Sequence, residues 1–423
     1  MVALYTGHSS PSEMMQPKLF WKWCLTSLLL TVVVVALFNL LMDPYLIFGT
    51  LRIPGINARK SAADSEFWLM KAYDVRRYAP KTILLGSSPT AVGIRAQSPV
   101  WKDTYRPVYN LATPWSGPYV NYRYLQHVMA MRHISLVVLG LEWDDFVAAY
   151  RNELFESYAI EQHLMVNRDG TPNSKELEGG IRAIGYASLS LQALQDSTAE
   201  LIANLRGDSS DLIQGDFDWI GMHDSHGAGS YVSVVRNDVG IARMSRPLGS
   251  QPNSKVMAEV RAILDLCEAQ GTSIIVFISP SYVDMLEMMD LVGYWKWYEN
   301  WERSLVSLMS QYPTKRSGVS GAVFQLWDFS GYDSYSTESV VNDGQRLHWF
   351  GDFWHYRPEL GDTIIEALME TGQNGFGVLL TTQNIEPHLA KFRELRQVYR
   401  EHHPLETRRL RALHALVENS RTN

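Results

Sequence analysis

Cysteine is almost absent from this chain of 423 residues, in which only Cys24 and Cys267 occur. Cys24 lies in an apolar stretch and Cys267 in a segment with a helical pattern, so we expect no disulfide, and cysteine usage assigns no redox compartment. The chain also lacks an excess of positive charge. Its net charge of −7 argues against a nucleic-acid partner. Apolar residues are abundant, at 46% of the chain, which is enough for a large core.

One long stretch lacks charge altogether and is rich in Leu and Val. Residues 23–42 contain no charged side chain, and about 20 residues at ~1.5 Å each reach ~30 Å, the thickness of a bilayer core. We therefore predict a transmembrane helix over 21–42, the alternative being a buried core helix. No site for a signal peptidase follows it. Because Lys18 and Lys22 precede it, the positive-inside rule places residues 1–20 in the cytoplasm and the remainder outside.

Short apolar runs recur in the part of the chain that follows. Each is rich in Val, Ile, Leu or aromatic side chains, as buried parallel strands are. The predicted strands are 82–85, 108–111, 136–141, 274–279 and 323–329. Helical patterns precede or separate most of them, at 65–77, 119–132, 255–270, 295–311 and 358–371. This alternation predicts an α/β fold with a five-stranded parallel sheet between two layers of helices, a three-layer α/β/α sandwich.

The predicted strands are unevenly spaced, because about 130 residues separate the third from the fourth. We assign an insertion at about 146–254, with a helix over 188–205, and expect it to cap the carboxyl edge of the sheet. His223, Asp224 and His226 in this insertion are metal ligands by type. A solvated turn explains them as well, and we predict neither a metal nor a cofactor.

Basic residues gather near the end of the chain. Seven of them lie between positions 391 and 411, in a segment with a helical pattern. Such a segment can contact anionic lipid or a partner, or it can be a solvated surface helix. We place the main domain at 43–372 and this basic helical tail at 373–423.

A serine follows the first predicted strand directly. Gly86 allows a tight turn after the strand, Ser87 and Ser88 come next, and Pro89 can open a helix. A serine at a strand-to-helix turn lies at the carboxyl end of the strand, where parallel α/β sheets place reactive groups. The alternative is an ordinary helix N-cap, a position that favours serine.

An Asp and a His three positions apart lie near the end of the predicted domain. Asp352 and His355 come just before a helix that Pro358 can open. In an irregular turn, this spacing lets the carboxylate reach one imidazole nitrogen and leaves the other to face a serine. A serine hydroxyl needs such a base to become a nucleophile, and the carboxylate orients and stabilises the imidazole. The alternative is a structural histidine in an aromatic-rich turn.

Together these two segments resemble the SGNH (GDSL-like) hydrolase superfamily, and the resemblance covers the domain between the membrane segment and the tail. Gly86-Ser87-Ser88 stands where the superfamily has Gly-Asp-Ser, with Ser87 in the Asp position. Asp352-x-x-His355 is similar to its last block. The resemblance implies an SGNH-like sandwich in which Ser88 is the nucleophile, His355 the base and Asp352 the acid partner of the base.

Two further blocks of the superfamily have counterparts here. Asn110 and Gly117 match the second block, and the resemblance implies an oxyanion hole made by the backbone N–H groups of Ser88 and Gly117. In the third block, Glu142 takes the position of an Asn that donates to the oxyanion, and an ionised carboxylate cannot donate. Asn110 and Asp144 are candidate substrate contacts, although the acids from 142 to 145 can equally cap the next segment.

Aromatic residues are frequent near these blocks. Trp115, Trp143, Trp349 and Trp354 can form a platform for sugar rings, or they can pack against the edge of the sheet. Of the four, we assign Trp115 and Trp354 as candidate substrate-binding residues.

More narrowly, the sequence is similar to the membrane-anchored, exported branch whose members act in bacterial cell-surface and exopolysaccharide acylation. This resemblance implies a single-pass protein of the bacterial inner membrane with its domain in the periplasm. The implied activity is that of a serine esterase or O-acyltransferase on acylated carbohydrate or cell-surface polysaccharide. Its partners would be the bilayer, through residues 23–42, an acylated glycan or acyl donor, and other polysaccharide assembly proteins. The alternative is a catalytically idle scaffold or binding component of a polysaccharide assembly or export complex, which Glu142 favours.

Overall fold

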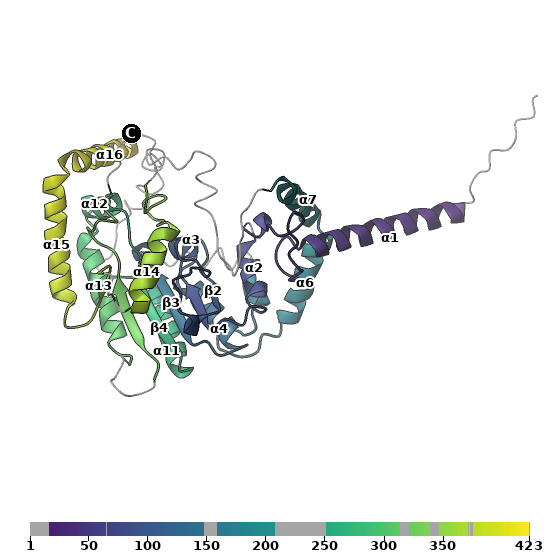
Figure 1. The fold of residues 1–423 in the computed structure, drawn as a ribbon, viewed down its shortest axis with the longest axis horizontal. Coiled ribbons are helices and arrows are strands. Elements are labelled where there is room, and N and C mark those ends of the chain that lie inside the picture. The colour runs from purple at the N-terminus through teal and green to yellow at the C-terminus, as the bar shows by residue number, and fades with distance from the viewer. Residues whose placement is uncertain are drawn as a thin grey trace, which may run out of the picture.

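The protein is an α/β body from which one long helix protrudes (Figure 1). The computed structural model describes residues 17–64, 66–147, 159–207, 251–313, 321–338, 347–370, 372 and 375–422. A single sheet crosses the body and helices pack along it, so the α/β class that we predicted from alternating strands and helices is confirmed.

The sheet has six strands in the order β2-β1-β3-β4-β5-β6. The strands are β1 (Thr82–Leu85), β2 (Val108–Asn110), β3 (Leu136–Leu141), β4 (Ser273–Ile278), β5 (Phe324–Asp328) and β6 (Val378–Leu379). The first five are parallel and lie within one residue of the predicted bounds, because burial makes them continuous apolar runs. The sixth pairs antiparallel with β5. The sheet is therefore mixed, not the purely parallel five-stranded sheet that we expected.

Seven helices surround the sheet within the described part of the domain. They are α2 (Phe67–Asp74), α3 (Ser88–Gly93), α4 (Pro118–Met129), α11 (Ser254–Ala269), α12 (Val283–Leu291), α13 (Trp295–Met309) and α14 (Pro358–Glu370). Short 3-10 helices are η1 (Ser61–Asp64), η2 (Asp103–Tyr105), η3 (Trp143–Phe146) and η5 (Ile160–His163). α4 packs against α11, α14 against α3, and α13 against β5.

The protruding helix is α1 (Pro17–Met42), which begins four residues before the predicted span. Residues Lys18–Met42 have a mean hydropathy of 2.5 and are mostly exposed. By length and composition the helix can cross a membrane. The kind of membrane and the orientation of the chain stay predictions.

The described part of the predicted insertion contains two long helices, α6 (Glu176–Leu189) and α7 (Leu191–Arg206). Only the second was expected, because glycines interrupt the apolar pattern of α6. Both helices pack against α1, and α7 also contacts η1 (Figure 1). These contacts are with α1 and its connector, and residues 148–158 and 208–250 of the predicted cap lie outside the described part of the chain. His223, Asp224 and His226 lie outside the described residues.

The predicted basic tail forms α15 (Ile385–His402) and α16 (Pro404–Thr422). Its arginines dock on the acidic side chains of α12. Arg400 lies 2.8 Å from Glu287 and 2.6 Å from Asp290, and Arg409 lies 2.8 Å from Asp284. These two basic residues therefore form ion pairs within the protein. We expected either a contact with lipid or a partner, or a solvated helix, and not these internal pairs.

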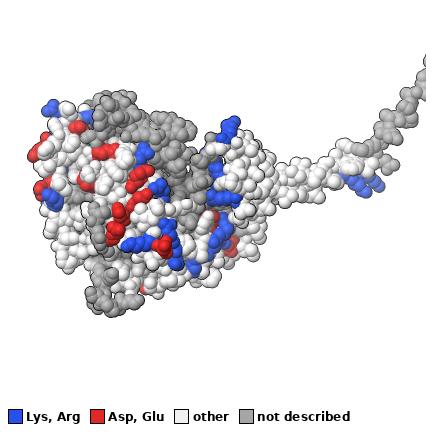
Figure 2. Space-filling model, in the orientation of Figure 1, with Lys and Arg blue, Asp and Glu red and all other residues white. Residues whose placement is uncertain are grey.

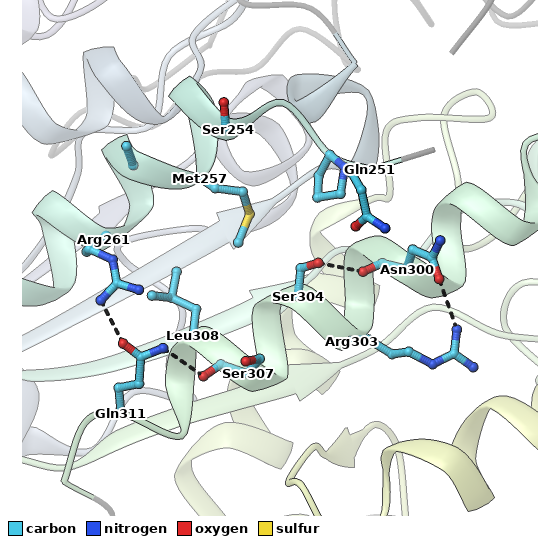
Figure 3. A pocket seen from close by; sticks show the side chains of 12 residues that line it. Gln251, Ser254, Met257, Arg261, Asn300, Arg303, Ser304, Ser307, Leu308 and Gln311 are labelled. Carbon is cyan, nitrogen blue, oxygen red and sulfur yellow. Dashed lines mark hydrogen bonds between the residues drawn. The ribbon is translucent and has the colours of Figure 1, made fainter. Parts of the chain in front are cut away.

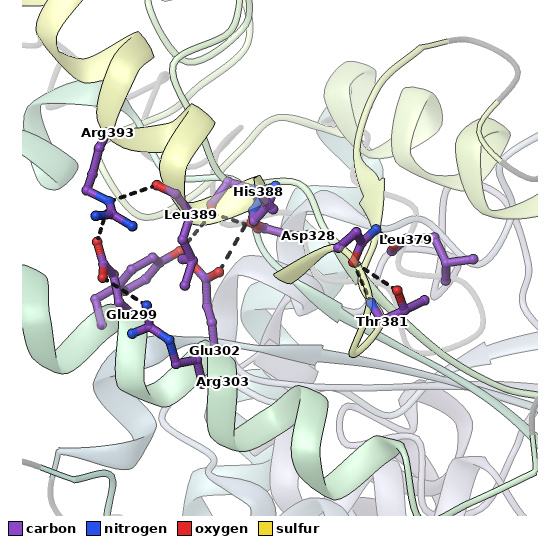
Figure 4. Close-up of polar contacts among 12 residues, drawn as sticks. Glu299, Glu302, Arg303, Asp328, Leu379, Thr381, His388, Leu389 and Arg393 are labelled. Carbon is purple, nitrogen blue, oxygen red and sulfur yellow. Dashed lines mark hydrogen bonds and ion pairs between the residues drawn. The ribbon is translucent and has the colours of Figure 1, made fainter. Parts of the chain in front are cut away.

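A buried polar cluster ties α15 to the sheet (Figure 4). His388 Nε2 lies 2.7 Å from Asp328 Oδ2 at the end of β5 and 3.8 Å from Glu302 Oε2 on α13. Burial raises the pKa of Glu302, and the charge of Asp328 raises it further. Burial alone would lower the pKa of His388, but the hydrogen bond and charge of Asp328 raise it overall. Folding therefore strengthens proton binding at both groups.

We expect the unfolding free energy to fall as pH rises through the folded pKa values of Glu302 and His388, because the folded state holds more protons than the unfolded chain. The variant Glu302→Gln cannot bind a proton at this position. Its unfolding free energy should therefore decline less steeply than that of the parent between about pH 5 and 9. Thermal unfolding of the full chain in mild detergent measures this. Glu394→Gln, an exposed glutamate on α15, is the matched control and should follow the parent. Parallel curves for Glu302→Gln and the parent would contradict the interpretation.

Candidate active site

Ser88 is the first residue of α3 and follows β1 after a two-residue turn. Gly86 in this turn has φ +150°, and a Cβ there would lie 2.5 Å from Thr90 Oγ1. A glycine is therefore needed for the chain to turn so tightly. Ser87, not Ser88, is the N-cap, and its side chain makes no capping hydrogen bond. Helix capping thus does not account for Ser88.

Asp352 and His355 lie in a tight turn before α14. Phe350 forms an antiparallel bridge with Tyr356 across this turn, and Gly351 N donates to the carbonyl of His355 at 2.8 Å. Asp352 Oδ1 accepts backbone N–H bonds from Trp354 at 2.7 Å and His355 at 2.8 Å. The carboxylate is thereby held in one orientation, with its second oxygen facing the imidazole.

The structure brings Ser88, His355 and Asp352 into one hydrogen-bonded chain. Ser88 Oγ lies 2.9 Å from His355 Nε2, and His355 Nδ1 lies 2.7 Å from Asp352 Oδ2. Burial by itself would raise the pKa of Asp352, but the charge and hydrogen bond of His355 and the two backbone donors lower it overall. An ionised Asp352 accepts from Nδ1–H, which leaves Nε2 to accept from the serine hydroxyl. This is the arrangement that activates a serine as a nucleophile.

Close packing between α3 and the chain after His355 fixes the distance between the serine and the imidazole. A Cβ on Gly361 of α14 would lie 1.8 Å from the carbonyl oxygen of Gly93, the last residue of α3. A Cβ on Gly93 would lie 2.1 Å from the ring of Tyr356, which directly follows the histidine. Neither glycine has room for a side chain, so α14 meets the backbone of α3 at Gly361 and the ring of Tyr356 packs directly on Gly93.

Asn110 supports α3 from within the core, and its contact with a substrate stays a prediction. Its side chain is completely buried. It donates to the carbonyls of Ala91 at 3.1 Å and Ile94 at 3.0 Å, and it accepts from Ala112 N. Asn110 therefore secures the end of the helix that begins at Ser88.

The segment around Gly117 is tied to the serine turn. The carbonyl of Gly86 accepts from Thr113 N at 3.2 Å and from Ser116 Oγ at 2.7 Å. Gly117 is the N-cap of α4. These bonds hold the segment that contains Gly117 beside Gly86, two positions before Ser88, and the oxyanion hole itself stays a prediction.

Trp115 is the exposed aromatic residue of this segment. About half of its side chain is exposed, at 51%, and its backbone has φ +63°. A bulky residue with positive φ is uncommon and costs free energy, and such conformations cluster at functional sites. The contact of Trp115 with a substrate stays a prediction.

The third predicted block has a buried carboxylate at its start. Glu142 is 7% exposed, and its Oε1 accepts from Ser279 Oγ at 2.8 Å. Burial and then the charge of Glu142 raise the pKa of Tyr356 well above its ordinary value. Glu142 thus belongs to the polar support under the site. Asp144 lies on η3 and is partly exposed.

The tryptophans of the predicted platform separate into different environments. Trp143 is buried and stacks on Trp354 with ring centroids 5.8 Å apart. Trp349 packs edge-on against Tyr335 at 4.9 Å. Trp354 is partly buried and lies between Asp352 and His355 in the chain. The described contacts of Trp143 and Trp349 are packing contacts, and a sugar platform stays a prediction.

Sequence reasoning missed the residues that pack beneath Ser88 and His355 in the interior of the protein. Ser279, at the end of β4, carries no signal in the sequence, because its partner Glu142 is far away along the chain. Tyr356 has a signal only in its position next to His355. Gly93 and Gly361 look like ordinary helix-end residues until the two helices are seen to touch.

Two other polar features of the described residues include no member of the triad. A groove of about 600 Å³ lies between α11 and α13 and is lined in part by Arg261, Asn300 and Gln311 (Figure 3). Glu302, Asp328 and His388 lie close enough together to share a metal ion. Both features are built on other elements than the serine turn.

Comparison with known proteins identifies no family for this chain. The chain matches no protein-family model and no curated protein sequence.

Gly361→Ala should destabilise the protein by about 1–3 kcal/mol, because the new Cβ forces α14 away from α3. Gly185→Ala is the control, since its Cβ meets nothing within 4 Å in α6, and it should be neutral or stabilising by about 0.5–1 kcal/mol. Denaturant unfolding of both variants measures the difference. Equal stability of the two would show that the contact between the helices does not constrain the fold.

Proposed function

We propose that this protein is a serine esterase or O-acyltransferase of the SGNH-like kind, acting on acylated carbohydrate or cell-surface polysaccharide. The observation that carries the proposal is the hydrogen-bonded chain from Ser88 through His355 to Asp352, with distances of 2.9 Å and 2.7 Å. Its position at the carboxyl end of β1 in a largely parallel sheet is further support, because ligands of such sheets bind at that edge.

The proposed mechanism starts at Ser88 Oγ. His355 Nε2 takes the hydroxyl proton as the oxygen attacks the ester carbonyl, and Asp352 stabilises the imidazolium that forms. His355 then gives the proton to the leaving alkoxide, and the acyl group stays on the serine. Water or a sugar hydroxyl attacks this acyl-enzyme next, with His355 again taking the proton. The first acceptor gives hydrolysis and the second gives transfer.

The proposed oxyanion hole uses backbone donors. Ser88 lies in the first turn of α3 and Gly117 caps α4, so neither N–H has an acceptor within its own helix. Glu142 accepts a hydrogen bond from Ser279 and offers no donor in its ionised form. Because loss of one oxyanion donor typically costs ~10²–10³ in rate, we expect a slow enzyme unless another donor enters with the substrate.

The lack of a side-chain donor at Glu142 favours a second candidate function. If two backbone donors are too few, the protein is a catalytically idle scaffold or binding component of a polysaccharide assembly or export complex. Glu142 supports this alternative, because its carboxylate is engaged in holding β4 and not aimed at a substrate as a donor.

The setting that we propose is the bacterial inner membrane, with α1 as the anchor and the domain in the periplasm. Support comes from the length and apolar composition of α1, and from Lys18 and Lys22 near its start. An anchored domain works next to a membrane-bound acyl donor or to other polysaccharide assembly proteins, which are the partners that we propose.

Ser88→Ala should abolish labelling by a fluorophosphonate probe, which requires a serine oxygen to displace fluoride from phosphorus. Ser87→Ala is the matched control and should keep the label, because the neighbouring hydroxyl makes no capping bond. Labelling is followed by in-gel fluorescence on full-length protein. Unlabelled parent protein that is demonstrably folded would favour the scaffold, and a labelled Ser88→Ala variant would exclude the triad.

Trp115→Ala should raise KM for an acylated oligosaccharide by up to about fivefold, because an exposed aromatic face that stacks on a sugar contributes about 1 kcal/mol. The kcat should change little, since Trp115 does not take part in proton transfer. Steady-state kinetics with p-nitrophenyl acetate on the same variant serve as the control, because this small ester has no sugar. Equal losses on both esters would argue against a carbohydrate contact at Trp115.

A further inference from the structure

Exposed apolar side chains are concentrated on α6 and α7. Outside α1, fourteen large apolar side chains are exposed among the described residues, and seven of them lie on this helix pair. They are Leu177, Ile181, Ile184, Leu189, Leu191, Ile202 and Leu205. Three are at least 70% exposed, which is unusual for Leu on a water-facing surface when its neighbours are also apolar.

The exposed side chains follow helical spacing. Leu177, Ile181 and Ile184 repeat at intervals of four and three residues and therefore share one face of α6. Glu178 and Arg182 form an exposed ion pair on an adjacent face of the same helix. On α7, Leu191, Ile202 and Leu205 lie on one side of the helix, which also carries the exposed Gln195 and Thr198. α6 thus combines an apolar face with a polar flank, as helices in a membrane interface do, and α7 adds further exposed apolar side chains to the pair.

Both helices are attached to the end of α1. Asn39, a buried polar residue of α1, donates to the carbonyl of Ser188 at 3.0 Å. Tyr45, just after α1, stacks on Tyr186 of α6 at 5.3 Å and donates to Asp196 of α7 at 2.6 Å. The apolar faces of α6 and α7 are therefore fixed in position relative to the membrane helix.

The depth of this attachment can be compared with a bilayer. Burial of α1 begins at Val35 and reaches Met42 at the end of the helix, which spans about 10 Å at 1.5 Å per residue. If the uncharged stretch from 23 to 42 fills the hydrocarbon core, α6 and α7 contact its last third. Interfacial helices bury their apolar faces by ~5–10 Å, which is the same depth.

We propose that α6 and α7 form a second membrane contact, with their exposed apolar faces in the interfacial layer of the bilayer that α1 crosses. The lipid surface is the occupant that the structure favours, because both helices pack on α1, whose exposed apolar side chains a bilayer would surround. Leu51 and Ile56 in the connector after α1 are exposed as well. Figure 2 shows largely uncharged surface where α1 meets the body, with both basic and acidic side chains beside it. The Lys and Arg among them can meet anionic lipid headgroups.

Depth-dependent quenching tests the proposal on the full chain. Cys24→Ser removes the exposed thiol, and Cys267 is buried with a raised thiol pKa, so it stays unreactive. Single cysteines replace Ile181 or Ile202, carry a nitrobenzoxadiazole label, and are reconstituted in phosphatidylethanolamine–phosphatidylglycerol vesicles. Lipids with a nitroxide near the headgroup end of the acyl chain should reduce the fluorescence at both sites by about twofold or more, as expected for interfacial burial.

Three control positions make the result specific. Leu29→Cys on α1 is the positive control, and Leu405→Cys, an equally apolar and exposed site on α16, should not be quenched. Glu178→Cys lies on the polar flank of α6 and should be quenched less than Ile181→Cys. Quenching at Leu29 without quenching at Ile181 and Ile202 would overturn the proposal and leave the anchor intact. Blue-shifted emission at Ile181 without quenching would also overturn it, because a protein surface, such as a second copy, would then cover the helices.

Catalysis by Ser88 is not a readout of this experiment. The membrane contact therefore stands or falls separately from the proposed esterase or acyltransferase activity.

Discussion

The hydrogen bond between the Ser88 hydroxyl and the His355 imidazole joins two residues that are 267 positions apart. Its length depends on how closely α3 and the chain before α14 can approach. Gly93 and Gly361 permit that approach by having no side chains, and the ring of Tyr356 fills the remaining space against Gly93. Because protein interiors are densely packed, even one added methyl group between these elements would separate the hydroxyl from its base.

The residues of the predicted motif blocks divide into those that are buried under this bond and one that is open to solvent. Asn110 holds the end of α3, and Glu142 with Ser279 bridges the ends of β3 and β4. Each of these buried groups has a partner, as burial of a polar group requires. Trp115 stands apart, since it is exposed and has an uncommon backbone conformation. Asn110, Glu142 and Trp115 all come from the predicted motif blocks, but their burial separates the two supporting residues from the exposed one.

The amino-terminal and carboxyl-terminal parts of the chain differ in the kind of interaction that they offer. At the amino end, α1 and the pair α6–α7 present apolar surface that water does not favour. At the carboxyl end, arginines of the tail meet the acidic residues of α12, and His388 joins Asp328 and Glu302 under α15. The basic tail thereby completes the body of the protein, and its charge pattern finds its complement within the same chain.

Local patterns in the sequence determined the parallel strands, most helices and the apolar span. A buried strand such as Leu136–Leu141 is a continuous apolar run, and its bounds follow from composition alone. The strand β6 escaped prediction because two residues are too few to show a period, and α6 escaped because its glycines lower the helix propensity of an otherwise periodic segment. The spacing of Asp352 and His355 suggested a pair, and the turn gave that pair its geometry.

Only the tertiary structure decided which distant residues meet. That Gly361 touches Gly93, that Glu142 accepts from Ser279, and that α6 lies against α1 and not over the serine are all contacts between segments far apart in the chain. Such contacts arise from how the layers pack around a shared core. No window of the sequence records that packing, because each partner taken alone is an ordinary glycine, acid or amphipathic helix.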